Sequence, residues 1–264
     1  MLEVKNVYKT FNEGTVNEKK ALQGINLTLE DGDFVTVIGG NGAGKSTLLN
    51  MIAGVYPVDE GNIVIDGHDV TKYPEHKRAK FIGRVFQDPR MGTATDMWLE
   101  ENLSLAKRRG KPRTFRWAIT RKERDEYRDM LKQLDLGLEY RLTTKMGLFS
   151  GGQRQAVTLL MATMNKPKLL LLDEHTAALD PKTAAKVLEL TDNFITEGNL
   201  TALMVTHNMK DAIAHGNRLI MMNRGEIILD IKGEEKKNLT VEMLLEQFAK
   251  ASGTEFMNDR ALLG

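Results

Sequence analysis

The chain has 264 residues, enough to bury a substantial core without help from disulfides or metals. Its 37 Lys and Arg residues balance 36 Asp and Glu residues, for a formal net charge of +1, so the global charge indicates neither nucleic acid nor an anionic membrane surface as a partner. The chain has no cysteine, which excludes a disulfide framework and any thiolate metal site and fits a reducing compartment.

The first segments favour an antiparallel sheet followed by a strand, a loop and a helix. Residues 2–11 and 21–29 alternate polar and apolar side chains, which predicts two strands with one solvent-exposed face. Residues 33–39, DFVTVIG, predict a third strand that runs into glycines and the helical pattern KSTLLNMIAGV. Further strands are expected at GNIVIDG and at KFIGRVFQD, the latter ending at Gln87. We expect neither a signal peptide nor a membrane span, because no apolar run approaches about 18 residues.

A helical, heavily charged region interrupts this pattern between residue 97 and about residue 140. Met130, Leu131 and Leu134 form a helical stripe there, so we interpret the region as an inserted helical lobe. Its basic residues could contact phospholipid or nucleic acid, but a solvated face is the expected role. They are Lys107, Arg108, Arg109, Lys111, Arg113 and Arg116.

The remainder alternates strands with helices, which predicts a mainly parallel sheet. An apolar helical face follows residue 150, and PKLLLLDE is typical of a strand buried on both faces. A helix is expected through KTAAKVLELTDNFIT, then a strand TALMVT ending at His207 and a hairpin turning at residues 223–225. From residue 232 the tail is polar and then amphipathic, with Met243 on its apolar face, and we expect it to pack on the core.

The segment GGNGAGKST fits the pattern G-x-x-x-x-G-K-[ST] between a predicted strand and a predicted helix, which is the context of a phosphate-binding loop. Its backbone N–H groups and the helix N-terminus favour phosphate, Lys45 would reach the β- and γ-phosphates, and Ser46 would offer its hydroxyl to Mg²⁺. The predicted ATP-binding residues of this loop are Gly39, Gly40, Asn41, Gly42, Ala43, Gly44, Lys45, Ser46 and Thr47.

Two carboxylates follow the apolar run LLLLDE. Because successive side chains along a strand point to opposite faces, we expect these two carboxylates to serve different purposes. We predict that Asp173 belongs to the Mg²⁺ site and that Glu174 orients or deprotonates a water in line with the γ-phosphate. By local chemistry alone, His207 and Gln87 are ordinary polar residues at strand ends.

A second helix start, GLFSGGQRQ, also has the features of an anion site, with Ser150 placed to cap the helix. Six short motifs follow one another in the chain: GGNGAGKST, VFQD, FSGGQRQ, LLLLDE, AALD and VTH. In this order they resemble the ATP-binding cassette (ABC) ATPases, and the resemblance runs through most of residues 2–230. The resemblance implies an α/β P-loop NTPase fold with a RecA-like core, an antiparallel β-subdomain and an inserted α-helical subdomain. We therefore expect an ABC ATPase domain over residues 1–232, with the helical subdomain at about 90–150, and a C-terminal helical tail over 233–264.

The resemblance also assigns roles to residues whose local chemistry is ambiguous. Gln87 matches the glutamine that contacts Mg²⁺ and water, His207 the histidine that contacts the γ-phosphate, and Phe11 the aromatic residue that stacks on adenine, with Tyr8 as the alternative. In such proteins the signature segment completes the ATP site of a second subunit. The residues predicted to act in trans are Phe149, Ser150, Gly151, Gly152, Gln153 and Asp180.

Three positions depart from the family pattern. Phe149 replaces the usual leucine before the signature serine and is expected to anchor the loop. His175 replaces the proline that commonly follows the glutamate, and Ala177 replaces a serine. We expect His175 to be neutral and hydrogen-bonded, whereas both changes leave the communication between the two ATP sites open.

The resemblance predicts an ATPase that dimerises on ATP and powers uptake of a small solute, an amino acid by similarity to uptake systems proposed for tryptophan or other aromatic amino acids. Its implied partners are a second copy, transmembrane permease subunits that dock near residues 88–102, and a solute-binding lipoprotein or periplasmic protein. No nucleic acid is expected, and the location would be the cytoplasmic face of the cell membrane. An exporter cassette and a non-transport ATPase of iron–sulfur cluster assembly remain alternatives.

Overall fold

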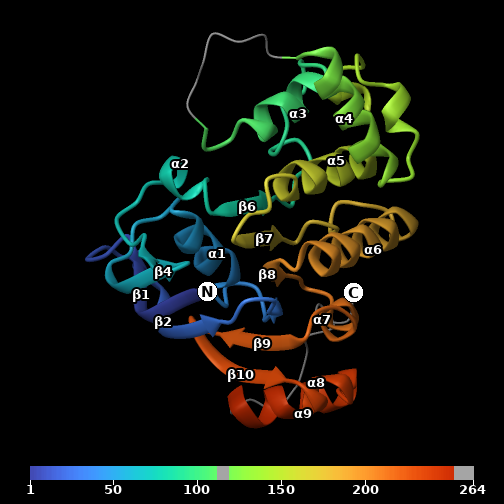
Figure 1. Ribbon diagram of the computed structural model, residues 1–264. Helices are drawn as coiled ribbons and strands as arrows, with labels where there is room; N and C mark the ends of the chain where they lie inside the picture. Colours follow the sequence, from blue (N-terminus) through green and yellow to red (C-terminus); the bar gives the residue numbers. More distant parts are fainter. Residues whose placement is uncertain (112–118, 253–264) are drawn as a thin grey trace.

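The computed structural model describes residues 1–111 and 119–252, which form two β-sheets with helices around them (Figure 1). The smaller sheet has the antiparallel strand order β2-β1-β4-β5. Its strands are β1 (Leu2–Phe11), β2 (Lys19–Leu29), β4 (Glu60–Ile65) and β5 (His68–Asp69). Buried and exposed residues alternate along much of β1 and β2, which confirms the predicted sheet with one exposed face.

The larger sheet has the strand order β10-β9-β3-β8-β7-β6 and is parallel except for the hairpin β9–β10. Its strands are β3 (Phe34–Ile38), β6 (Ile82–Val85), β7 (Leu169–Asp173), β8 (Thr201–Val205), β9 (Arg218–Asn223) and β10 (Glu226–Lys232). Strands β3 and β8 are buried along their whole length because helices cover both faces of the sheet. The hairpin turns at Arg224 and Gly225, both with positive φ, as predicted.

Strands β6 and β8 are shorter than the sequence pattern predicts. They end at Val85 and Val205, so Gln87 and His207 lie in loops beyond the strands. Local hydrogen bonds replace the strand-to-strand hydrogen bonds at both places. The Asp88 carboxylate accepts from the Arg90 N–H at 2.9 Å, and Thr206 Oγ1 accepts from the Asn208 N–H at 3.1 Å.

The helices divide the core into layers. Helix α1 (Lys45–Ala53) packs between the two sheets, whereas α5 (Gly151–Thr163) and α6 (Pro181–Gly198) cover the opposite face of the larger sheet (Figure 1). The short helices α2 (Glu75–Arg78) and α7 (Met209–Ala214) lie in connections at the edges of this core. As a result the loops after β3, β7 and β8 meet at one end of the sheet.

The inserted lobe contains α3 (Leu99–Lys107), α4 (Arg121–Lys132) and two 3₁₀ turns, η1 (Leu138–Tyr140) and η2 (Met146–Leu148). Main-chain hydrogen bonds close its base, where Leu99 N donates to Thr144 O at 3.0 Å and Met146 N donates to Met97 O at 3.0 Å. Leu131 and Leu134 are fully buried in it, which agrees with the predicted helical stripe.

The basic cluster of this lobe is the expected solvated face only in part, since Lys111 is exposed but three other members have protein partners. Lys107 pairs with Glu126, Arg108 Nη2 lies 3.2 Å from a Glu123 oxygen, and Arg109 Nη2 donates to Ala162 O at 3.2 Å. These three side chains therefore attach α3 to neighbouring helices rather than only facing water. Two further members of the cluster, Arg113 and Arg116, lie outside the described residues.

The tail forms α8 (Glu234–Lys237) and α9 (Val241–Ser252) against β9, β10 and α7. Leu239 and Leu244 are buried in a core shared with Met209 and Leu219, and Lys236 Nζ donates to Gly216 O at 2.8 Å. This agrees with a packed tail, while the domain boundary at residue 232 stays a prediction. Met243, which we expected on the packed face, is instead 42% exposed. No helix in the described part of the chain is long and apolar enough to cross a bilayer.

Candidate active site

The phosphate-loop segment joins β3 to α1, as the sequence predicts. Gly39 has φ of 151°, and a Cβ placed there would lie 2.2 Å from Met222 O. Gly44 has φ of 103°, and its Cβ would lie 2.6 Å from Ala21 O. Both positions therefore require glycine, because the backbone is left-handed and the neighbouring main chain occupies the space of a side chain.

This loop forms a pocket of about 170 Å³ with Glu174 on its wall. Lys45 lies inside it, only 7% exposed, and its Nζ donates to Gly39 O at 2.7 Å. Burial lowers the pKa of Lys45, and the carboxylates of Glu174 and Asp173 oppose that shift. The pocket is lined by Lys19, Ala21, Asn41, Gly42, Ala43, Gly44, Lys45, Ser46, Thr47 and Glu174. Lys19 was not predicted as a site residue, because a lysine at the start of an alternating strand gives no local signal.

The structure brings Ser46 and Asp173 together. Ser46 Oγ lies 3.5 Å from Asp173 Oδ1, and the other carboxylate oxygen, Oδ2, lies 3.7 Å from Nη2 of Arg84. Burial raises the pKa of Asp173, and the Arg84 guanidinium opposes the shift. Asp173 and Gln87 also line a second pocket, of about 720 Å³, so the predicted Gln87 lies near this carboxylate.

The chemistry of this group suits Mg²⁺, since a hydroxyl, a carboxylate and an amide carbonyl are the hard oxygen donors that this ion prefers. Among the described residues no cluster of three or more His, Cys, Asp or Glu side chains forms a metal cage. Mg²⁺ usually keeps waters and is held by one or two carboxylates together with phosphate oxygens. The residues present therefore fit a metal that arrives with a phosphate ligand.

Glu174 and His207 also meet, with His207 Nδ1 3.6 Å from Glu174 Oε2. Strand β7 ends at Asp173, and Glu174 has φ of 43°, so the expected strand alternation between these carboxylates is wrong. A left-handed turn separates them instead, and it is secured by a hydrogen bond of 3.0 Å from Glu174 N to Val205 O. The outcome is still two carboxylates in different places, one at Ser46 and one at His207.

The signature segment begins α5 as predicted. Ser150 Oγ accepts from Gln153 N at 3.2 Å and Gln153 Oε1 accepts from Ser150 N at 3.1 Å, which is a complete capping box. Phe149 is 3% exposed and lies against the Arg141 guanidinium, 4.4 Å from the ring centroid, so it anchors the loop. In the described part of the chain, residues 149–153 are not among those that line the phosphate pocket.

Thr183 connects the signature with Asp180. Asp180 caps α6 by accepting from Thr183 N at 3.1 Å. A Cβ at Gly152 would lie 1.9 Å from Thr183 Cγ2, so the close packing of α5 on α6 requires glycine there. A Cβ at Gly151 would meet only Leu179, at 3.5 Å.

Phe11 and Tyr8 are the two candidates for the residue that stacks on adenine. Phe11 pairs with Lys19 across β1 and β2, so it lies beside a residue of the phosphate pocket, and its ring meets the Tyr56 ring edge-on at 5.2 Å. Tyr8 instead directs its hydroxyl towards Gly24. The placement favours Phe11 over Tyr8.

His175 is 2% exposed, and its Nε2 lies 3.0 Å from Thr191 Oγ1. Burial, followed by repulsion from His215, lowers its pKa to about 4. Its side chain is therefore a neutral, hydrogen-bonded part of the interface with α6, as expected.

Comparison with known proteins agrees with this geometry. Residues 22–177 match the family model described as ABC transporter. The chain is 46% identical over 251 residues to a tyrosine transport ATP-binding protein of Clostridioides difficile (strain R20291), covering 95% of this chain and 100% of the relative. It is 34% identical to methionine import ATP-binding protein MetN 2 of Enterococcus faecalis (strain ATCC 700802 / V583), covering 94% and 76%.

Solved structures show the same architecture. The chain matches the dimeric post-hydrolysis state of the ATP-binding cassette MJ0796 bound to ADP and phosphate, with a TM-score of 0.75, 31% identity and coverage of 88% of this chain and 98% of that one. The phosphate loop, the carboxylates after β7 and the capped signature helix thus occur together in a cassette fold. The chain belongs to the ABC transporter family as an ATP-binding ATPase subunit.

Proposed function

We propose that this cassette binds ATP with Mg²⁺ and hydrolyses it with the residues that converge at the end of the larger sheet. Phe11 contacts adenine, and residues 39–47 hold the phosphates. Ser46, Asp173 and Gln87 hold the metal, which when bound supplies positive charge to the phosphates. The observation that carries this proposal is the placement of Lys45 and Glu174 in one pocket, with Asp173 at Ser46.

In the same proposal Glu174 orients and deprotonates the attacking water, and His207 contacts the γ-phosphate. The 3.6 Å separation of His207 Nδ1 and Glu174 Oε2 supports this division of roles, since both groups can then address one reacting centre. Burial of Lys45 and Asp173 excludes water from the charges that bind phosphate and metal, respectively, which strengthens these interactions.

We further propose that the ATP site is completed by a second copy of the chain. The signature residues 149–153 lead into the capped N-terminus of α5, whose capping box uses the N–H groups of Ser150 and Gln153 and not those of Gly151 and Gly152. These residues do not line the phosphate pocket of their own subunit in the described part of the chain. Phe149 fixes this segment in its subunit, and Thr183 holds the signature and Asp180 together. ATP would join the loop 39–47 of one subunit to Ser150, Gly152 and Gln153 of the other, an arrangement supported by the dimeric relative MJ0796.

The transported solute is proposed to be an amino acid, with tyrosine as the first candidate. The support is the full-length similarity to a protein named for tyrosine transport and the further similarity to one named for methionine import. The cassette would act at the cytoplasmic face of the membrane, bound to separate permease subunits near residues 88–102 and served by a solute-binding lipoprotein or periplasmic protein. The pocket that contains Gln87, Asp88 and Met91 supports this contact, since it joins the proposed docking segment to Asp173.

Purification of the native complex from membranes tests this function. A tagged cassette should retain a permease and a binding protein, and binding of tyrosine, tryptophan and phenylalanine to that binding protein should then be measured by calorimetry. Vesicles with the complete complex should take up the bound amino acid only when ATP is present. Co-purification with iron–sulfur assembly proteins and no permease would contradict the proposal.

A further inference from the structure

Arg84 lies beside the proposed metal site and has no role in the function described so far. It is on β6, and its side chain is 12% exposed. Its guanidinium Nη2 donates to Asn50 Oδ1 at 2.7 Å and lies 3.7 Å from Asp173 Oδ2, and the group packs over the Phe86 ring at 4.5 Å. Its Nε finds no hydrogen-bond partner among the described residues, so the guanidinium is held through Asn50 and Asp173.

These contacts form a closed ring of side chains. Ser46 and Asn50 are four residues apart on α1 and therefore share one face of the helix. Ser46 contacts one oxygen of the Asp173 carboxylate, and Asn50 holds the arginine that faces the other. The metal side and the arginine side of Asp173 are thus assigned to different oxygens.

Two largely buried cations face the carboxylates of this region before any ligand binds. Lys45 interacts with Glu174 and Asp173, whereas Arg84 interacts first with Asp173 and then with Glu75. Lys45 is hydrogen-bonded to the carbonyls of Gly39 and Gly40, whereas Arg84 points at Asp173. A divalent cation that approaches Asp173 without phosphate therefore meets a carboxylate whose charge is already compensated.

We propose that Arg84 is the resident counter-cation of Asp173 and makes metal binding at this site depend on nucleotide. This rests on the proposed function, because it assigns a positioning residue to the same metal site. Arg84 keeps the carboxylate oriented towards Ser46 and repels a free divalent ion at short range. The phosphates of a bound nucleotide supply the negative charge that outweighs this repulsion.

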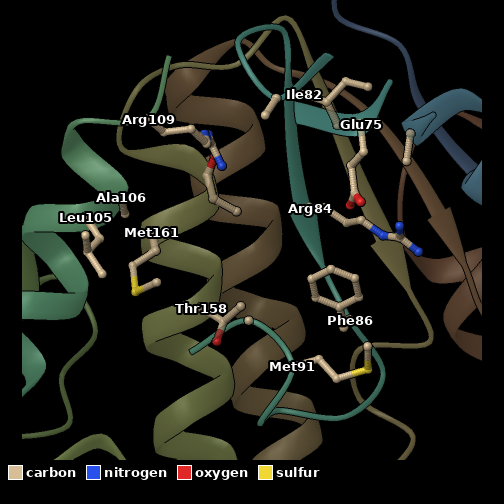
Figure 2. Close-up of a pocket in the computed structure, with 14 residues that line it drawn as sticks. Glu75, Ile82, Arg84, Phe86, Met91, Leu105, Ala106, Arg109, Thr158 and Met161 are labelled. Carbon is tan, nitrogen blue, oxygen red and sulfur yellow. The ribbon is translucent and has the colours of Figure 1, made fainter. Parts of the chain in front are cut away.

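A second buried arginine, Arg109, provides a matched control. Arg84 and Arg109 both line an apolar pocket of about 410 Å³, and Figure 2 shows them on opposite sides of it, with the Arg84 guanidinium directed away from Arg109. Arg109 is also largely buried, but it donates to Ala162 O. Loss of either guanidinium removes a largely buried positive charge, but of these two arginines it is Arg84 that faces Asp173.

The test is a Mn²⁺ titration followed by electron paramagnetic resonance, with and without a non-hydrolysable ATP analogue. Without nucleotide, Arg84→Met and Arg84→Gln should bind Mn²⁺ about tenfold more tightly than the parent, because one repelling charge is gone. Arg84→Lys, which keeps the repelling charge, and Arg109→Met, which leaves Arg84 in place, should stay within about twofold of the parent. Circular dichroism checks that each variant is folded. If Arg84→Met does not fold, the result for Arg84→Gln is used instead.

The outcomes separate the inference from the function on which it rests. If the parent fails to bind Mn²⁺ even with the analogue, the proposed metal site is wrong and the inference falls with it. If the parent binds Mn²⁺ with the analogue but the Met and Gln variants are no tighter than the parent without it, only the role of Arg84 is overturned. Equal tightening in Arg109→Met would overturn it as well.

Discussion

His207 Nδ1 lies 3.6 Å from Glu174 Oε2, although helix α6 and strand β8 separate the two residues in the chain. The contact arises because β7 and β8 are adjacent parallel strands, with Asp173 paired to Val205, so the loops that follow them begin side by side. The register of the sheet therefore brings together the two side chains that we assign to the attacking water and to the γ-phosphate.

Replacing Glu174 by Gln should leave ATP binding intact and lower turnover at least about a hundredfold, because the amide cannot accept the proton of the attacking water. The variant should accumulate as an ATP-bound dimer. Phosphate release and size-exclusion chromatography with ATP measure the two effects. Glu189→Gln, an exposed change on α6, is the control and should behave as the parent. Hydrolysis by Glu174→Gln at the parent rate would show that the assigned base is wrong.

Replacing Ser150 by Arg should prevent ATP-dependent dimerisation while monomers still bind nucleotide. The arginine side chain cannot replace the serine hydroxyl that caps α5, and it would occupy the space in which the phosphates bound to the partner subunit would lie. Binding of a fluorescent ATP analogue and light scattering with ATP separate the two properties. Thr196→Arg adds the same charge at an exposed position in the last turn of α6 and should still dimerise. Retained dimerisation of Ser150→Arg would count against the trans role.

Gly39→Ala should lower the free energy of unfolding by about 2 to 4 kcal/mol, even without nucleotide. The new methyl group would meet Met222 O at 2.2 Å on a backbone with φ of 151°. Gly40→Ala is the matched control, since a Cβ there meets nothing within 4 Å, and should cost less than about 1 kcal/mol. Urea denaturation measures both, and equal stability of the two variants would show that the loop relaxes around Gly39.

His175 should make the protein less stable in acid. Its pKa falls from 6.5 to about 4 on folding. Between these two pH values the unfolded chain therefore binds a proton at His175 that the folded protein does not bind. Stability is therefore lost as the pH falls through this window, by about 2 kcal/mol between about pH 7 and pH 5. His175→Gln can keep the contact with Thr191 without titrating. Denaturation at both pH values should show a smaller acid loss for the variant, and parallel losses would contradict the assignment.

Much of the site could be predicted because its signals are local. The phosphate loop, the capping box of Ser150 and Gln153 and the buried strand before Asp173 each depend on neighbours within a few residues. Strand ends were predicted less well, since Gln87 and His207 lie in loops where side-chain hydrogen bonds replace the ladder.

The sequence by itself determined the order of the main strands and helices, the glycine-rich loop and the carboxylates after the buried strand, since these follow from periodicity, capping and spacing along the chain. The roles of Gln87 and His207 came only from the resemblance to the ABC ATPases. Only the tertiary structure decided that Lys19 lines the phosphate pocket and that Arg84 faces Asp173 while Asn50 holds it. Those contacts join elements far apart in the chain, and their geometry depends on how sheets and helices pack. Local patterns carry no information about which polar side chains that packing brings together.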